Sequence, residues 1–419
     1  MSNAWKRMGG AIALSMVAVF AAACGDDGSS SSSPSVDLSV LGKANPATGS
    51  PVKVGLFNVE GGSSVSLPEV GDASQAAVDY ANGHLGGLDG HKIEVVRCGD
   101  KADGASSAAC ANEFVREGVV AVVSGLSATA DQAVPVLQGA GIPWISMSAS
   151  APTELADDNA FFFGSGFVGT LAAQAVYSAD QGWKTVTLIG TENPQVVSAV
   201  NSIGKKLFED HGVKLNLVTV PSGTPDASSQ VAAALHTNPD ALDIIGEAPL
   251  CQTILSAASN AGASQAKMLI STCVTDEVKA AVGESAIEGA VVFDNYVATG
   301  DSEEAKLYQA VMKQYAPDTS TAGLTPNGYR TMLGFIRGVD AGEIKTGNVT
   351  PAAISQTLRG AVDVPLPIGL GATFSCDKTQ FPLEGVKGTF CTSKQFTTTY
   401  SAKGPGSPRV VDAAGALSR

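Results

Sequence analysis

The stretch Gly141-Ile142-Pro143-Trp144-Ile145-Ser146-Met147-Ser148-Ala149-Ser150-Ala151-Pro152 joins a short apolar run to a loop of small and hydroxyl residues. The run at 142–146 predicts a buried β-strand, because its β-branched and aromatic side chains favour a pleated sheet. In the loop, backbone N–H groups and serine hydroxyls can converge at the carboxyl end of that strand. Such a loop suits a ligand carboxylate, although serines in these positions can equally cap a helix or fill a turn.

The residues on both sides of this stretch alternate between predicted strands and helices. Before it, strands at 52–57, 92–97 and 119–123 alternate with helices at 69–83, 104–117 and 128–138. After it the pattern restarts, with strands at 185–189, 215–220, 241–245, 268–271 and 290–293 and helices at 171–180, 196–211, 227–235, 251–261 and 275–282. Short β-branched runs between helices are typical of parallel βαβ units. We therefore predict an α/β fold of two doubly wound, Rossmann-like lobes with a ligand cleft between them.

The last part of the chain has a different character. Two helices, 302–315 and 327–341, follow each other without a strand between them, and 373–376 and 388–391 predict an antiparallel pair of strands. We expect lobe one to comprise residues 51–165 and about 297–365, and lobe two residues 166–296 and about 366–402. Residues 403–419 are predicted as a flexible tail.

The N-terminus predicts export from the cytoplasm. Lys6 and Arg7 precede an uncharged run at 11–23, whose small residues at 21–23 fit the cleavage site of a signal peptide spanning 1–23. Cys24 follows directly and resembles the lipidated cysteine of a bacterial lipobox, so we expect an extracytoplasmic protein anchored to the cell membrane by a lipid. A plain secretory signal followed by an incidental cysteine is the alternative. Residues 24–50 begin with a Gly/Ser/Asp-rich stretch and are predicted as a flexible tether.

Composition limits the partners that the chain can have. With 26 basic and 40 acidic residues, the chain carries a formal net charge of −14 and has no electrostatic footprint for nucleic acid. Its length of 419 residues exceeds the usual size of a single hydrophobic core, so two domains are expected.

The seven cysteines divide into Cys24 and six others. An even number of cysteines in an exported protein favours disulfides over free thiols. Nearest neighbours each fall within one supersecondary unit, which predicts the pairs Cys98–Cys110, Cys251–Cys273 and Cys376–Cys391. No pair has the spacing of a zinc site, so no metal is expected.

A second loop, Gly125-Leu126-Ser127-Ala128-Thr129, also follows a predicted strand. Together with Val52-Lys53-Val54-Gly55 and the Gly-Ile-Pro-x-Ile-Ser stretch, it resembles the leucine/isoleucine/valine-binding family of ABC importer solute receptors, over about residues 52–400. The resemblance implies a periplasmic-binding type I fold with three hinge crossings. It also implies a monomer that delivers its ligand to an ABC permease and ATPase complex. By this resemblance, Ser127, Ser148, Ala149 and Ser150 hold a ligand carboxylate through hydroxyl and main-chain N–H groups.

Lobe two departs from the family pattern. Members that bind amino acids hold the ammonium group with a glutamate after the strand that here is 268–271, where this chain has Thr272-Cys273-Val274. The expected aromatic residues are replaced around Asn193 and Glu247. Glu247 could serve as the ammonium partner, or it could be an exposed loop acid. These differences favour a small organic or aromatic acid, or an amide, at least as strongly as leucine, isoleucine or valine.

Signatures of enzymes are weak in this chain. Gly164-Ser165-Gly166-Phe167-Val168-Gly169 has the form of a dinucleotide-binding fingerprint, but it follows only a three-residue run and is not at the first βα turn. We interpret it as the first crossing between the lobes. No nucleophile elbow, zinc-protease motif or P-loop is found, so we expect neither an enzyme nor a cofactor. The expected function is a solute-binding receptor of an ABC importer, and the alternative is a ligand-sensing module of a signalling system.

Overall fold

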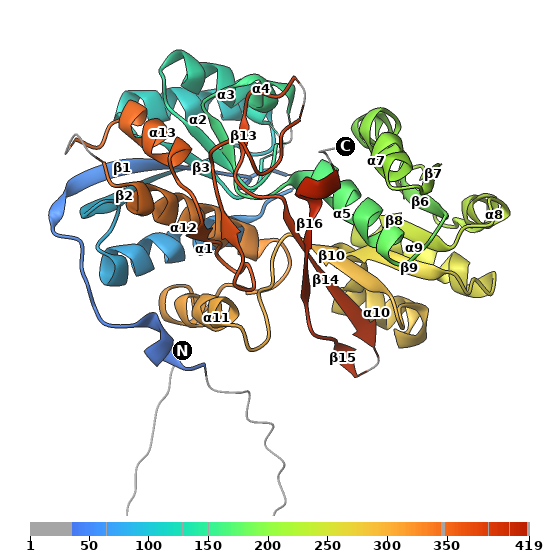
Figure 1. Cartoon of the computed structure of the whole chain (residues 1–419). Coiled ribbons are helices and arrows are strands. Elements are labelled where there is room, and N and C mark those ends of the chain that lie inside the picture. Colours follow the sequence, from blue (N-terminus) through green and yellow to red (C-terminus); the bar gives the residue numbers. More distant parts are fainter. Residues whose placement is uncertain are drawn as a thin grey trace, which may run out of the picture. The chain divides into compact units, whose positions relative to one another are not determined.

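The computed structural model describes residues 36–63, 65–127, 129–149, 151–344, 348–383, 385–401 and 403–416 (Figure 1). Its first sheet has six parallel strands in the order β13-β5-β4-β3-β1-β2. These strands are β1 (Gly49–Asn58), β2 (His91–Gly99), β3 (Val122–Ser124), β4 (Trp144–Ser146), β5 (Ala160–Phe162) and β13 (Thr389–Phe390). We call this sheet and its helices lobe one.

Helices cover both faces of the lobe-one sheet. One face packs against α1 (Pro68–Tyr80), η2 (Ala81–Leu85), α11 (Glu303–Tyr315), α12 (Thr325–Gly342) and α13 (Pro351–Arg359), with η1 (Leu38–Leu41) beside α11. The other face packs against α2 (Gly104–Glu117), α3 (Ala130–Gly139) and α4 (Pro152–Ala156). Because side chains alternate along a strand, Leu56 and Phe57 of β1 enter opposite cores.

The second sheet forms lobe two. Its order is β15-β14-β10-β9-β8-β6-β7, and β16 also pairs with β14. The strands are β6 (Thr185–Thr191), β7 (Lys214–Val220), β8 (Ala241–Ile245), β9 (Ala266–Ile270), β10 (Val291–Asp294), β14 (Lys394–Ser401), β15 (Gly404–Pro405) and β16 (Arg409–Asp412). One face packs against α5 (Gly166–Asp180), α6 (Pro194–Ala199), η3 (Val200–Gly204) and α7 (Lys205–Asp210). The other packs against α8 (Ser228–His236), α9 (Ala248–Asn260) and α10 (Asp276–Val282).

The two sheets have the same winding. In each lobe, the first five strands in chain order lie in the spatial order 2-1-3-4-5. These orders are β2-β1-β3-β4-β5 in lobe one and β7-β6-β8-β9-β10 in lobe two. This is a doubly wound order, so the predicted α/β fold of two such lobes is confirmed. In open sheets of this kind a ligand binds beyond the carboxyl ends of the strands, where the order reverses. That place lies between β1 and β3 in lobe one and between β6 and β8 in lobe two.

The chain passes between the two sheets three times. It leaves lobe one after β5 and enters α5, which confirms that the glycine-rich stretch at 164–169 is a crossing. It returns after β10 to α11, and it leaves again between β13 and β14. Gly166 has φ +60°, a conformation that favours glycine, where α5 begins.

The C-terminal part differs from the sequence prediction. Residues 373–376 and 388–391 do not form a hairpin, because β12 (Thr373–Phe374) pairs with β11 (Val364–Pro365) while β13 pairs in parallel with β5. The ring of Phe390 packs 4.9 Å from that of Phe162, which explains why β13 joins the edge of lobe one. Lobe two therefore regains the chain at β14 and not near residue 366. The predicted flexible tail is also wrong, since β16 pairs antiparallel with β14.

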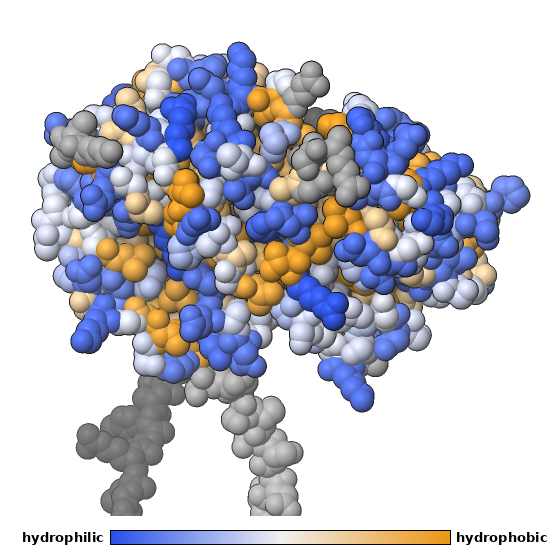
Figure 2. Space-filling model, viewed as in Figure 1, coloured by the Kyte–Doolittle hydropathy of each residue, from blue (hydrophilic) through white to orange (hydrophobic). Residues whose placement is uncertain are grey.

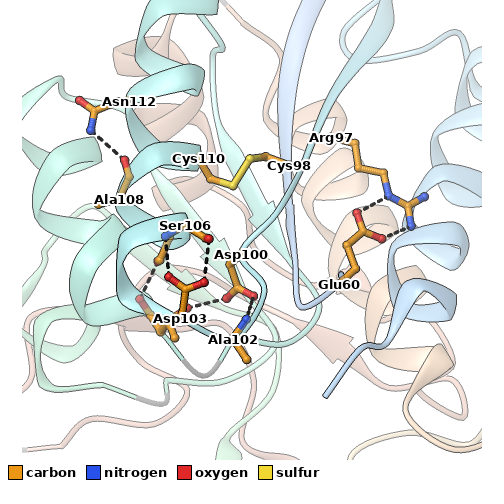
Figure 3. Close-up of a disulfide and its surroundings, with 12 residues drawn as sticks. Glu60, Arg97, Cys98, Asp100, Ala102, Asp103, Ser106, Ala108, Cys110 and Asn112 are labelled. Atoms are coloured by element: carbon orange, nitrogen blue, oxygen red, sulfur yellow. Dashed lines mark hydrogen bonds and ion pairs between the residues drawn. A yellow bond between two sulfur atoms is a disulfide. The ribbon is translucent and has the colours of Figure 1, made fainter. Parts of the chain in front are cut away.

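Among the described residues there are three disulfides, with the pairing that the sequence predicted. The Cα–Cα distances are 5.6 Å for Cys98–Cys110, 5.1 Å for Cys251–Cys273 and 4.2 Å for Cys376–Cys391. Figure 3 shows the first of them, which ties the end of β2 to α2. Among the described residues, no helix combines the length and the apolar character that a membrane span requires. The predicted signal peptide and Cys24 lie outside the described residues.

Candidate functional site

The first predicted ligand loop lies between β3 and α3. Ser127 is partly exposed, and its Oγ accepts a hydrogen bond of 3.2 Å from the backbone N–H of Thr129. The hydroxyl of Thr129 in turn donates to the carboxylate of the buried Asp100. The turn role considered for Ser127 is therefore real. It occupies only an acceptor site, so the Ser127 hydroxyl proton remains able to donate to a ligand.

The second loop follows β4 and is fixed by a buried acid. Glu154 accepts hydrogen bonds from Trp144 Nε1 at 2.7 Å and from the backbone N–H of Ala151 at 2.8 Å, and Ser146 Oγ contacts it at 3.3 Å. Ser148 and Ala149 are partly exposed within this braced loop. Ser150 lies outside the described residues.

The lobe-two candidates follow β6 and β8. Asn193 is exposed, and its Oδ1 accepts a 3.4 Å hydrogen bond from the backbone N–H of Val196 at the start of α6. Glu247 is exposed at the N-terminus of α9, and its side chain makes no capping hydrogen bond there. After β9, Thr272 Oγ1 donates to the backbone carbonyl of Gly246 at 2.6 Å. Thr272, which stands near the position of the family's glutamate, therefore forms a hydrogen bond with the backbone of lobe two.

A cavity of about 920 Å³ adjoins the loop after β4 and the start of α6, and we call it the α6–α7 pocket. Lobe one contributes Ala149, Ala151, Pro152, Leu155, Leu383 and Phe390; the first crossing and α5 contribute Ser165, Gly166, Phe167 and Val168. Lobe two contributes one side of the α6–η3–α7 helix, together with Ala416. On the face shown in Figure 2, hydrophobic surface gathers in the region that α5 and β16 occupy in Figure 1. Of the predicted site residues that are described, Ala149 alone lines the pocket.

The helix over the pocket contains a π-helical turn. The segment η3 interrupts α6 and α7 with one wider turn, a feature that recurs at functional sites. Ile203 and Leu207 from this helix line the pocket, as do Lys206 and Asp210. The last two form an ion pair of 2.6 Å at positions i and i+4, so the charges at this rim neutralise each other.

A hydrogen-bond network beside the pocket joins the three crossings. The side chain of Gln395 is fully buried at the start of β14. Its Nε2 donates to Ser165 Oγ of the first crossing at 2.9 Å and to Asn295 Oδ1 of the second at 2.8 Å. Nothing in the local sequence around Gln395 indicates this role.

Arg330 of α12 lies against the same crossings. Its side chain is fully buried, and its Nε donates to the backbone carbonyl of Phe163 at 3.1 Å. The guanidinium carbon lies 5.8 Å from the ring centre of Phe396, while the two terminal nitrogens have no hydrogen-bond partner in the described part of the chain. Burial lowers the pKa of Arg330 to about 9, and the nearby Asp294 opposes that shift. The sequence analysis did not identify this residue; its only signal is a cation among the buried positions of α12.

Comparisons with known proteins identify the family of the chain. Residues 51–381 match the sequence pattern of the periplasmic binding protein family. A search of curated proteins gave no match.

Several solved structures share the fold at low sequence identity. A leucine-binding protein from Thermotoga maritima MSB8 has 18% identity and a TM-score of 0.64, with 86% of this chain and 99% of that chain covered. A fatty acid ABC transporter substrate-binding protein from Thermomonospora curvata has 17% identity and a TM-score of 0.66, with 88% and 94% covered. An ABC transporter solute-binding protein from Rhodopseudomonas palustris HaA2, in complex with p-hydroxybenzoic acid, has 18% identity and a TM-score of 0.67, with 88% and 99% covered.

These likenesses agree with the two doubly wound lobes and their three crossings. The family description covers well over half of the sequence and begins within β1. The resemblance drawn from the Gly-Ile-Pro-x-Ile-Ser stretch and the loop at Ser127 is confirmed. The chain belongs to the periplasmic binding protein family, with the type I fold.

Proposed function

We propose that the protein is the extracytoplasmic solute-binding receptor of an ABC importer. One observation carries this proposal: a single cavity is lined by both lobes and by the first crossing between them. A solute in such a place changes the contacts between the lobes when they close, which is how a two-lobed receptor couples binding to a change of shape. A permease can then distinguish the loaded from the empty form.

The solute is proposed to carry a carboxylate. The Ser127 hydroxyl accepts from Thr129 and can donate its proton to a ligand, and Ser148 and Ala149 belong to a loop that Glu154 holds in place. We assign the carboxylate to these three residues and to Ser150. Calorimetry of Ser148→Ala should show a ten- to hundredfold weaker affinity for the ligand, since a hydrogen bond to a charged group contributes about 1.5–3 kcal/mol. Ser259→Ala, at an exposed position of α9, is the matched control.

The other end of the ligand need not carry an ammonium group. Asn193 and Glu247 are the polar residues proposed to face it, and both are exposed. A panel of leucine, p-hydroxybenzoate and a fatty acid, measured by calorimetry, separates the ligand classes. Binding of leucine that is lost in Glu247→Gln would assign the ammonium group to Glu247. Binding of the other two acids, unchanged in Glu247→Gln, would support an acid without an amino group.

The cellular role has its own test. Mass spectrometry of the solute that co-purifies from the native host should identify a small carboxylate. Uptake of that solute, labelled, should stop when the gene is deleted, whereas unchanged uptake would argue against an importer. We also propose that Cys24 carries a lipid anchor. Cys24→Ser should move the protein from the membrane to the soluble fraction without changing its affinity for the ligand.

A further inference from the structure

The α6–α7 pocket has more apolar space than an amino acid needs. Its volume of about 920 Å³ is near the upper end of the range for drug-sized ligands, roughly 300–1,000 Å³. A leucine side chain has only four carbon atoms and would leave most of this lining exposed to water. The pocket therefore raises the question of what body the ligand carries.

The lining is apolar on three sides. Phe167 and Val168 open α5, Ile203 and Leu207 come from the helix of lobe two, and Leu383 and Phe390 come from the C-terminal part of lobe one. Leu207 and Phe390 are at most 5% exposed and belong to a core cluster that spans both lobes. The apolar part of the lining is thus continuous with the hydrophobic core.

The charges at the rim also favour an apolar ligand body. Lys206 and Asp210 neutralise each other through their ion pair, so the rim presents no net charge to a ligand. The remaining polar side chains of the lining include Ser165, which is engaged by Gln395. A charged group in the pocket would lose its hydration without gaining a free partner of opposite charge, whereas an apolar body would lose nothing.

We propose that the ligand is a monocarboxylate with an extended apolar body, which lies in the α6–α7 pocket while the carboxylate lies at Ser148 and Ala149. Ala149 belongs to both the carboxylate loop and the pocket lining, so the two parts of the site are continuous. This inference rests on the proposed receptor function. It names the class of solute as amphipathic acids longer than the branched-chain amino acids.

A series of straight-chain acids tests the proposal. Calorimetry with butanoate, hexanoate, octanoate and decanoate should show an affinity that rises about fourfold for each methylene group, since burial of one methylene contributes about 0.8 kcal/mol. Leucine and isoleucine, measured in the same buffer, should bind more weakly than octanoate. An affinity that is flat along the series would overturn the inference.

Two tryptophan variants locate the body of the ligand. Ala199 and Ser202 line the pocket from the π-helical region, so Ala199→Trp and Ser202→Trp should fill it. We expect at least a tenfold loss of decanoate affinity, with butanoate affinity unchanged. Asn201→Trp is the matched control, because Asn201 is exposed on the same turn and does not line the pocket. Circular dichroism and melting temperature of each variant establish that the fold is retained.

The outcomes separate this inference from the proposed function. If short acids bind and depend on Ser148, but chain length and the two tryptophans have no effect, the receptor stands and the pocket assignment fails. If the tryptophan control at Asn201 weakens decanoate binding as much as Ala199→Trp, the pocket assignment also fails. If no carboxylate of any length binds, the carboxylate-binding function proposed above is itself contradicted.

Discussion

Gln174 Nε2 donates a 2.8 Å hydrogen bond to Asp243 Oδ1 in the interior of lobe two, where both side chains are fully buried. Asp243 Oδ2 and Gln174 Oε1 have no partner within the described residues. Burial raises the pKa of Asp243 well above its usual value. A protonated Asp243 can donate its hydroxyl to Gln174 Oε1, and this second bond would satisfy both unpartnered atoms.

The acid–amide pair predicts an unusual tolerance at Asp243. Asp243→Asn should change the free energy of unfolding by less than about 1 kcal/mol, because an asparagine amide can donate to Gln174 Oε1 as the protonated acid does. Asp243→Ala should cost at least about 1–3 kcal/mol, because Gln174 is left buried without a partner. Urea unfolding at pH 7 measures both. Equal losses in the two variants would contradict a protonated acid.

Asp340 predicts a pH dependence of stability. Burial raises the pKa of Asp340 to about 6, and the hydrogen bond from the backbone N–H of Asp89 opposes this shift. Because the folded-state pKa lies above the unfolded value, the stabilising contribution is full below pH 4 and is lost as the pH rises through 6. Relative to Asp340→Asn, the wild type should therefore lose stability between pH 4 and pH 7. Parallel unfolding free energies of the two proteins across this range would refute the assignment.

The network at the three crossings predicts a stability cost at Gln395. Gln395→Met keeps the length of the side chain but removes the donor to Ser165 and Asn295. We expect a loss of about 1–3 kcal/mol in urea unfolding, since the polar atoms of both partners stay without that donor. Gln356→Met, at an exposed position of α13, should stay within about 0.5 kcal/mol. If Gln395→Met loses no more stability than this control, the hydrogen bonds of Gln395 do not stabilise the three crossings.

We expect removal of the third disulfide to lower the free energy of unfolding measurably. Cys376 and Cys391 close a loop of sequence separation 15, for which restriction of the unfolded chain gives about 3 kcal/mol. Cys376→Ala with Cys391→Ala should lower the free energy of unfolding by roughly 2–4 kcal/mol. The control is a variant in which Cys98, Cys110, Cys251 and Cys273 are substituted, so that Cys376–Cys391 is its one remaining pair among the described disulfides, compared in the oxidised and the reduced form. No difference between the oxidised and reduced control would show that this crosslink does not stabilise the fold.

Local signals account for the parts of the fold that were predicted well. Helix α2 has the predicted bounds because both ends are encoded nearby: Asp103 accepts from the backbone N–H of Ser106, and Gly118 has φ +68°. The C-terminal strands carry no such signal. Strand β13 is only two residues long, and its position depends on Phe390 meeting Phe162 from a distant part of the chain.

In the candidate site too, some parts could be predicted from local sequence and others could not. The loops at Ser127 and Ser148 could be found because they follow recognisable strands and have a distinctive composition. The pocket could not, since its walls come from α4, the start of α5, the α6–η3–α7 helix and the segment before β13. Ser165 and Gln395 lie 230 residues apart in sequence, and only the folded chain brings them within hydrogen-bond distance.

The threading of the chain has a consequence for when the protein can fold. Lobe one receives its edge strand β13 at residues 389–390, and lobe two receives β14 at residues 394–401. Nearly all of the chain has therefore been synthesised before either sheet has its full set of strands. Domains usually fold in order as they emerge, but here the same late segment completes both sheets. Both lobes therefore depend on the C-terminal part of the chain for their complete sheets.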